Sequence, residues 1–418
     1  MTAPVEEAPT AAPRSQRRFA WLWGPAFVAA IAYVDPGNVA ANLTAGARHG
    51  YLLVWVLVVA NSMALLVQYL SAKLGLVTTR SLPELIGDRL GTGGRIAFWA
   101  QAELVALATD LAEVLGGAIA LHILFGLPML AGGVVVGAVS MVLLAVQSRR
   151  GQRPFEFVVM GLLLVITIGF TAGLFVSGVS WPEAVTGLVP RFDGAESVLI
   201  AASMLGATVM PHAVYVHSAL ARDRHRSRPG HPSHLPRLLR ATRWDVAVSM
   251  LLAGTVNIAM LLLAAGSLQG VESTDSIEGA HTAITAALGP VVGVLFGVGL
   301  LASGLASTSV GCYAGAAITS GLLRVRVSMP VLRLATMIPA LGVLAIGVNP
   351  TWALVLSQVL LSFGLPFALI PLVRLTSRRD VMGPLANRPL LRALAWIVVA
   401  LIVALNITLI VLTLGGAG

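Results

Sequence analysis

The feature that most constrains this chain is a series of apolar segments, each about twenty residues long, that recur from one end to the other. A helix of that length spans the hydrocarbon core of a bilayer, where backbone groups must be satisfied within the segment. Hydrophobic residues make up 57% of the chain and charged residues only 11%. We therefore predict an all-α integral membrane protein with eleven transmembrane helices, at residues 19–46, 51–72, 95–124, 127–146, 155–178, 197–221, 244–267, 283–322, 330–347, 351–374 and 392–414.

The basic residues indicate how the chain crosses the membrane. All but three of the 27 Lys and Arg residues lie in the N-terminal tail or in every second connection between spans. The exceptions are Arg48 and Arg191, in the opposite connections, and Arg333, inside a span. The positive-inside rule then predicts a protein of the cell membrane with a cytoplasmic N-terminus and an extracellular C-terminus. Because membrane topology explains the net charge of +9, we expect a lipid bilayer and no nucleic acid as partner. We also expect the protein to function as a monomer.

The spans divide into two groups of five. Residues 1–18 predict a disordered cytoplasmic tail, because they are rich in Ala, Pro and charge. The first five spans occupy residues 19–178 and the next five residues 197–374, with 392–414 as an additional helix. Because five is odd, two such groups lie in the membrane with opposite orientations, which is the arrangement of an inverted repeat.

Two segments depart from simple spans. Residues 81–91 predict a short interfacial helix, with Ser81 as N-cap and Glu84 three residues later. The segment 283–322 is too long for one span, so we expect its first residues to form a loop or an interfacial turn.

The first span of each group is interrupted by a proline beside polar residues. The first interruption is Asp35-Pro36-Gly37-Asn38 and the second is Thr208-Val209-Met210-Pro211-His212. Proline removes a backbone donor and disfavours helix at the residue before it. Matching interruptions in corresponding spans are typical of the binding site of a transporter. We predict that the first and sixth helices are each broken into two halves.

The side chains at the two breaks favour a particular class of metal ion. Asp35 and Asn38 offer oxygen ligands, which suit hard cations, whereas Met210 offers a thioether, which suits softer transition metals. Carbonyls freed near Ala32 and Ala207 would complete the shell. The mixture favours manganese, ferrous iron, cobalt or cadmium over magnesium and calcium. Such an ion would be transported cargo, and we expect no resident cofactor.

The third span carries three carboxylates on one helical stripe, Glu103, Asp110 and Glu113. Such groups need partners, water or protonation in a membrane, and a row of them is a plausible proton relay. Arg333 is the basic residue available to pair with one of them. His212, whose side-chain type titrates near neutral pH, would connect this row to the break. A purely structural polar network is the alternative. We expect Gln358, in the last span of the second group, to face the central cavity between the two groups.

Two further functional classes fit parts of this pattern. A carrier of amino acids or other organic solutes would use Asp35 for an amine but would leave Met210 without a role. A metal-gated receptor or channel would need the metal site but no coupled transport cycle. We expect no enzymatic activity, because the sequence shows no nucleophile–base set and no open metal triad.

The residues at the two breaks also resemble those of a known family. Asp35-Pro36-Gly37-Asn38 together with Met210-Pro211-His212 is similar to the motif pair of the NRAMP divalent-metal transporters, in particular the bacterial proton-coupled manganese transporters. Further similarity lies in Gln101–Ala106 and Thr109–Glu113 of the third span, Gly304–Gly315 of the eighth and Ser357-Gln358 with Phe363–Ala368 of the tenth.

This resemblance implies a LeuT-like fold of two inverted five-helix repeats and a proton-coupled importer of divalent metal. It implies metal ligands at Asp35, Asn38 and Met210 and at the carbonyls of Ala32 and Ala207, with Gln358 joining in some states. It also implies proton-pathway roles for His212, Glu113, Asp110 and Arg333. The chain departs from related sequences at Leu332-Arg333, where two adjacent arginines can occur.

Overall fold

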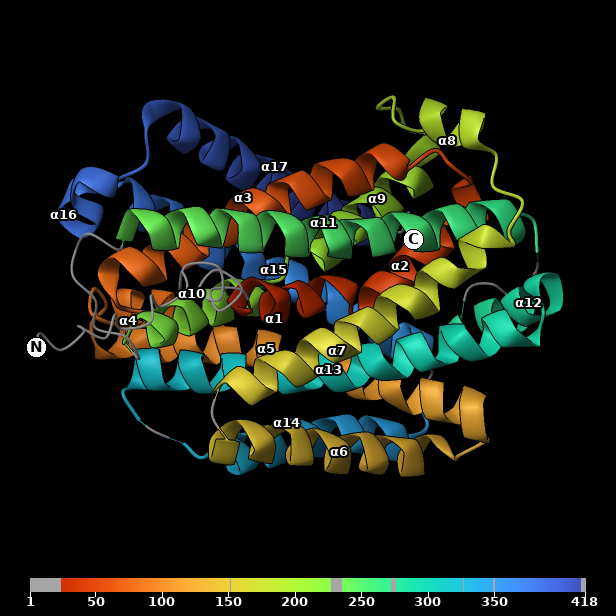
Figure 1. Ribbon diagram of the computed structural model, residues 1–418, viewed down its shortest axis with the longest axis horizontal. Coiled ribbons are helices and arrows are strands. Elements are labelled where there is room, and N and C mark those ends of the chain that lie inside the picture. The colour runs from red at the N-terminus through yellow and green to blue at the C-terminus, as the bar shows by residue number, and fades with distance from the viewer. Residues whose placement is uncertain are drawn as a thin grey trace, which may run out of the picture.

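The structure, a computed structural model, describes residues 24–150, 152–226, 235–271, 276–325, 327–348 and 350–414 (Figure 1). Helices dominate these residues, and no strand occurs in them. The predicted tail 1–18 lies outside the described residues. Eight helices are long and apolar enough to cross a membrane, and Pro25–Val34, Met129–Ala145 and Pro330–Ile346 are shorter apolar stretches. The chain is thus a multi-pass membrane protein.

The predicted spans correspond to helices in chain order. The first group comprises α1 (Pro25–Ile31) with the short η3 (Ala32–Val34) and α2 (Pro36–His49), then α3 (Val54–Thr78), α5 (Thr92–Phe125), α6 (Met129–Arg150) and α7 (Gln152–Thr171), which continues into η4 (Ala172–Phe175). The second comprises α9 (Gly194–Thr208) with α10 (Pro211–Arg226), then α11 (Leu235–Ser267), α13 (Pro290–Leu323), α14 (Met329–Ile346) and α15 (Pro350–Ser377). The additional helix is α17 (Pro389–Leu414).

Corresponding helices of the two groups pack in reciprocal pairs. The second helix of each group lies along the broken helix of the other, α3 against α10 and α11 against α2. The third helices, α5 and α13, form the most extensive pairing in the molecule. The fifth helix of each group packs on the third helix of the other, α7 on α13 and α15 on α5. Reciprocal packing of this kind follows from an inverted repeat, and the fold is LeuT-like, as predicted.

Close approach of α5 and α13 depends on Gly304. A Cβ added there would lie 2.9 Å from the amide nitrogen of Gly117 and 3.0 Å from the carbonyl oxygen of Glu113. Both neighbours are backbone atoms, which cannot move aside as a side-chain end can. Small residues at helix contacts allow this packing in membranes.

Helix ends differ from the predicted spans because hydropathy detects only the part of a helix that suits hydrocarbon. The helix α11 begins at Leu235, well before residue 244, and α3 continues to Thr78 rather than ending at residue 72. Polar residues at the ends of these helices continue the same backbone hydrogen bonding beyond the apolar core.

The two irregular segments were predicted with different success. The short helix α4 (Leu82–Gly87) has the expected capping box, since the side chain of Ser81 accepts from the amide of Glu84 and the Glu84 carboxylate accepts from the amide of Ser81. The start of segment 283–322 is not a loop or turn. It lies in a separate helix, α12 (Ile277–Leu288), which ends at Gly289 with φ 92° before Pro290 begins α13.

The remaining short helices lie at the two ends of the bundle. The helix α8 (Trp181–Thr186) lies with α12 at one end, and α4 lies with α16 (Arg379–Met382) at the other (Figure 1). A single turn, η6 (Gly383–Leu385), leads from α16 toward α17. The end that carries α4 and α16 is the one rich in arginine in the sequence.

Candidate functional site

At the break between η3 and α2, Asp35 is the N-cap of α2. Asp35 has an extended backbone, with φ −77° and ψ 168°, and its carboxylate accepts from the amide of Asn38 at 2.8 Å. Pro36 occupies the first helical position of α2, where a missing N–H costs nothing. At the break between α9 and α10, the extended residue Val209 ends α9 and Pro211 is the first residue of α10. The motif therefore ends one half-helix and starts the next, as predicted.

The two breaks face each other through Asn38. The Asn38 Nδ2 group donates to Asp35 Oδ1 at 2.7 Å and to the carbonyl oxygen of Ala207 at 2.9 Å. Asp35, Asn38 and Met210 are fully buried. The structure thus brings together groups that are far apart in sequence, and it places the Asn38 amide between two oxygens.

The carbonyls of Ala32 and Ala207 occupy equivalent positions. In a continuous α-helix each would accept from the amide four residues later, but those residues are Pro36 and Pro211, which have no N–H. Ala207 O accepts from Asn38 instead. The next carbonyls of the first break are satisfied by other helices, Tyr33 O by Asn257 Nδ2 at 2.8 Å and Val34 O by Ser303 Oγ at 2.5 Å. Irregular backbone at this depth is tolerated because protein groups surround it.

Gln358 reaches the first break from α15. A Cβ added to Gly37 would lie 1.9 Å from Gln358 Nε2 and 3.2 Å from Asp35 Oδ2, so a side chain at this position would collide with the Gln358 amide. Both polar atoms of that amide are buried and have no hydrogen-bond partner among the described residues, and the same is true of Asp35 Oδ2. These unsatisfied groups lie together beside the Asp35 carboxylate.

The second break also positions a histidine against the third span. His212, in the first turn of α10, is 1% exposed, and its Nδ1 lies 3.5 Å from Thr109 Oγ1 on α5. Thr109 directly precedes Asp110. His212 therefore contacts α5 next to Asp110, and no hydrogen bond among the described residues joins it to a carboxylate of the row.

Arg333 pairs with the middle carboxylate of that row. It is completely buried, its Nη1 donates to Asp110 Oδ1, and its Nε donates to Ser140 Oγ at 2.8 Å. Pairing lowers the cost of burying both charges in a low-dielectric interior. The other polar atoms, Asp110 Oδ2 and Arg333 Nη2, have no hydrogen-bond partner among the described residues. Ser140, on α6, is a partner that the sequence analysis did not include.

The other two carboxylates differ in their surroundings. Glu113 is fully buried against α13, where a Cβ added to Gly311 would lie 3.2 Å from its Oε2. Both of its carboxylate oxygens are buried without a hydrogen-bond partner among the described residues. Glu103 is half-buried and makes no hydrogen bond or ion pair with the described residues. It is not joined to the other two by any direct contact.

A second polar network was missed by the sequence analysis. Gln68 on α3 donates to Tyr33 Oη at 2.6 Å, and its Oε1 lies 2.7 Å from His217 Nδ1 on α10. All three side chains are buried. The available signal was the presence of Gln68 and His217 within apolar spans, since such residues face the interior of a bundle.

Ion pairs connect the helices at both ends of the bundle. At the α4 end, Arg222 Nη1 lies 2.8 Å from Glu84 Oε1, and Arg224 Nη2 lies 2.5 Å from Glu156 Oε2. At the α8 end, Arg48 Nη1 lies 2.5 Å from Glu196 Oε1. These contacts, with the burial of the break residues, leave the site enclosed between the two ends.

No group of three or more His, Cys, Asp or Glu side chains suited to a metal occurs among the described residues. A cation at the breaks would therefore rely on one carboxylate together with amide, carbonyl and thioether groups. Neutral amide, carbonyl and thioether ligands bind a cation more weakly than carboxylates do, which would suit an ion that is released again after transport.

Comparisons with known proteins agree with this architecture. Residues 26–412 match the Nramp family, described as natural resistance-associated macrophage protein-like. The chain is 60% identical over 407 residues to a protein of Mycobacterium tuberculosis named divalent metal cation transporter MntH, covering 96% of this chain and 94% of that one.

Solved structures give the same result. The Eremococcus coleocola manganese transporter, in complex with an aromatic bis-isothiourea compound, superimposes with a TM-score of 0.85 at 29% identity, covering 96% of this chain and 88% of that one. Mhp1, a nucleobase-cation-symport-1 family transporter, shares the fold alone, with a TM-score of 0.61 at 16% identity over 93% of this chain and 89% of its own. From the match over nearly its whole length, the chain belongs to the Nramp family.

Proposed function

We propose that this protein is a proton-coupled symporter that imports divalent transition metal ions by alternating access, with manganese as the main cargo and ferrous iron, cobalt and cadmium as alternatives. The observation that carries the proposal is the meeting of Asp35, Asn38 and Ala207 O at two facing helix breaks. The relatives are named as metal cation transporters, so this family is one of transporters and not of enzymes.

The Asn38 amide suggests how a cation would enter. Its Nδ2 group now donates to Asp35 Oδ1 and Ala207 O, which are both proposed ligands. A divalent cation between these oxygens would replace the two N–H donors, and the amide would rotate to offer its oxygen. The thioether of Met210, the carbonyl of Ala32 and the unsatisfied amide of Gln358 would complete the shell.

Proton coupling is proposed to run through the residues that adjoin this site. Asp35 must be deprotonated to ligate a metal, so metal binding releases its proton. The groups proposed for this route are His212, whose Nδ1 lies 3.5 Å from Thr109 Oγ1 on α5, and Glu113 and Asp110 on that same helix. Asp110 is paired with Arg333, and Glu103 lies farther along α5. The proton would move inward along this set while the metal leaves in the same direction.

The halves 19–178 and 197–374 would rearrange around the fixed site, with 392–414 outside the repeat. The end carrying α4 and α16 is proposed to face the cytoplasm, which places the C-terminus outside the cell membrane. Opening inward would break the Arg222–Glu84 and Arg224–Glu156 pairs, and opening outward would break Arg48–Glu196. We propose that one chain suffices for this cycle.

Uptake of labelled manganese into proteoliposomes tests the function as a whole. Under an inward proton gradient, we expect saturable uptake that acidifies the lumen and is unaffected by amino acids. Inhibition by an amino acid would instead indicate an organic-solute carrier. Flux that neither saturates nor acidifies the lumen would indicate a channel.

Replacing Met210 with Ala should reduce metal selectivity. Without the thioether the remaining ligands are all oxygens, which calcium accepts as readily as manganese. We expect the preference for cadmium or manganese over calcium to fall about tenfold, equivalent to about 1.4 kcal/mol of differential binding. Competition uptake measures this ratio. Met250→Ala is the matched control, since Met250 is likewise fully buried, lies on α11 and is not one of the proposed ligands. An unchanged ratio in Met210→Ala would exclude a thioether ligand.

Replacing Glu113 with Gln should impair proton movement more than metal binding. Gln has nearly the same shape but cannot carry a proton between the break and Asp110. We expect proton influx to fall at least about tenfold while metal affinity changes less than about twofold. A pH-sensitive dye in the proteoliposome lumen measures influx, and calorimetry measures affinity. Glu278→Gln, on the peripheral helix α12, is the control. Normal acidification by Glu113→Gln would rule out the relay.

A further inference from the structure

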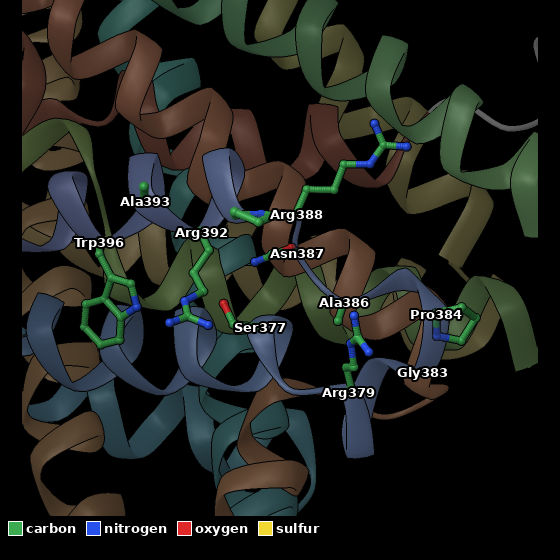
Figure 2. Close-up of a pocket in the computed structure, with 11 residues that line it drawn as sticks. Ser377, Arg379, Gly383, Pro384, Ala386, Asn387, Arg388, Arg392, Ala393 and Trp396 are labelled. Atoms are coloured by element: carbon green, nitrogen blue, oxygen red, sulfur yellow. The ribbon is translucent and has the colours of Figure 1, made fainter.

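A pocket of about 1070 Å³ lies where α15 ends, α16 intervenes and α17 begins (Figure 2). It is well separated in sequence from the helix breaks, and none of the proposed metal or proton groups lines it. The lining is basic and partly aromatic: Ser377, Arg379, Asn387, Arg388, Arg392 and Trp396 contribute its polar groups. Its volume is in the range of sites that hold a small molecule or a lipid headgroup.

Among the described residues, the arginines of this pocket have no acidic partners. Arg379, Arg388 and Arg392 make no ion pair with any residue in the described parts of the chain. The one carboxylate between residues 374 and 392 is Asp380, and it is paired with Arg378, whose Nη2 lies 2.7 Å from Asp380 Oδ2. Figure 2 shows Arg392 directed toward Ser377 and Arg379 directed toward Ala386 in another part of the pocket. The pocket therefore carries an uncompensated positive charge.

A buried lysine next to the pocket adds to its positive charge. Lys73, near the end of α3, is only 6% exposed, and its Nζ donates to Asn387 Oδ1 at 2.9 Å. Asn387 is fixed in turn by Thr376, since its Nδ2 donates to Thr376 Oγ1 at 2.9 Å. Arg243 acts on Lys73 as a like charge, and the lysine has no carboxylate partner among the described residues. A buried ammonium held by one neutral amide is costly unless an anion lies nearby.

The face of α17 beside the pocket is suited to lipid. Leu390, Leu394, Ile397 and Leu401 are all strongly exposed and follow helical spacing along one stripe. Arg392 and Trp396 lie on the adjoining face, one turn apart. Tryptophan is enriched at the level of lipid headgroups, where one part of its ring is in contact with water. An anion in the pocket could therefore continue into acyl chains along this stripe.

We propose that this pocket binds the phosphate group of an anionic phospholipid in the leaflet on the α4 and α16 side. Arg392, with Ser377 beside it, would hold the phosphate oxygens, because the planar guanidinium matches phosphate with paired hydrogen bonds. Arg379 would add positive charge from another part of the same pocket. Lys73 would supply charge through Asn387. The exposed leucine stripe favours a lipid over free phosphate, since soluble phosphate has no use for an apolar surface next to its site.

Native mass spectrometry with added lipids tests this assignment. We expect the purified protein to retain phosphatidylglycerol in clear preference to phosphatidylcholine. The double variant Arg379→Gln/Arg392→Gln should weaken phosphatidylglycerol binding about thirtyfold, since each basic side chain near an anionic lipid contributes about fivefold. Arg378→Gln is the matched control, because Arg378 is next in sequence but is paired with Asp380 and does not line the pocket. It should change binding by less than about twofold.

Two further measurements decide between sources of the anion and guard against misfolding. Size-exclusion profiles and manganese uptake of the double variant should match wild type, because neither arginine belongs to the transport site. Millimolar inorganic phosphate should leave bound phosphatidylglycerol in place. Displacement by inorganic phosphate would overturn the lipid assignment in favour of a soluble anion. Equal losses in the double variant and in Arg378→Gln would overturn the pocket itself, since the effect would then be diffuse surface charge.

Discussion

Replacing Asp35 with Asn is expected to reduce manganese uptake at least about a hundredfold. Residues that only support the ligands of a metal contribute about ten- to a hundredfold to its affinity, so losing a charged ligand should cost at least as much. Asparagine retains an oxygen that can accept from the amide of Asn38, so the N-cap of α2 survives the substitution. What the variant loses is the negative charge beside the Gln358 amide. The substitution therefore separates the proposed ligand role of Asp35 from its part in starting the helix.

The pH dependence of binding provides a second readout of the same variant. A ligating carboxylate must be deprotonated, so metal affinity of the wild type should fall as the pH is lowered. In Asp35→Asn this dependence should be much shallower, because the titrating ligand is gone. Calorimetry across a pH series measures both affinity and slope. Asp380→Asn, at the exposed pair with Arg378, is the control and should bind as wild type does. Uptake near the wild-type rate in Asp35→Asn would refute the site.

Replacing Arg333 with Leu is expected to destabilise the protein by about 3–5 kcal/mol, because it leaves the Asp110 charge buried without its partner. Ser140 would also lose its donor from Nε. The substitution would also remove one charged member of the proposed proton pathway. A lower unfolding temperature in detergent and slower acidification in proteoliposomes should therefore appear together.

A double variant separates the charge from the packing. Adding Asp110→Asn to Arg333→Leu removes the unpaired carboxylate, so the unfolding temperature should recover a large part of the loss. Proton uptake should not recover, because both members of the pair are then absent. Arg378→Leu removes one partner of the exposed pair with Asp380 and should leave the unfolding temperature unchanged. A double variant no more stable than Arg333→Leu would mean that shape rather than charge makes Arg333 important.

Some features of this membrane protein depend only on residues that are close together in the sequence. Pro36 and Pro211 each remove one backbone donor, and their equivalent places beside polar residues in the two groups marked both breaks in the sequence. Proline alone does not mark a break, because Pro366 and Pro371 lie inside the continuous helix α15. Ser81 and Glu84 specify the capping box of α4 in the same way. The spans and the fold class were predictable because hydrocarbon requires long apolar helices. The ends of the helices were not predictable in this way. The helix α11, for example, begins at Leu235, in a stretch of polar and basic residues that a hydropathy pattern does not assign to a span.

Contacts between distant segments required the tertiary structure. The sequence identified Arg333 and three carboxylates but could not choose among them, and the structure pairs Arg333 with Asp110 and leaves Glu103 apart. It also revealed the Tyr33–Gln68–His217 network and the packing of Gln358 against Gly37. Spacing within a helix fixes which side chains share a face, but which face meets which helix depends on packing of the whole bundle.

The sequence by itself thus determined a helical membrane protein of two inverted groups, each with its first helix broken at a proline. Those features depend on hydropathy and on backbone chemistry, which act within a few residues. Only the tertiary structure placed Asn38 between Asp35 and Ala207 and joined His212 to α5 through Thr109. It also assembled the basic pocket from α15, α16 and α17 above the buried Lys73. These arrangements arise where helices distant in sequence cross, and their geometry is set by the close packing of both groups together.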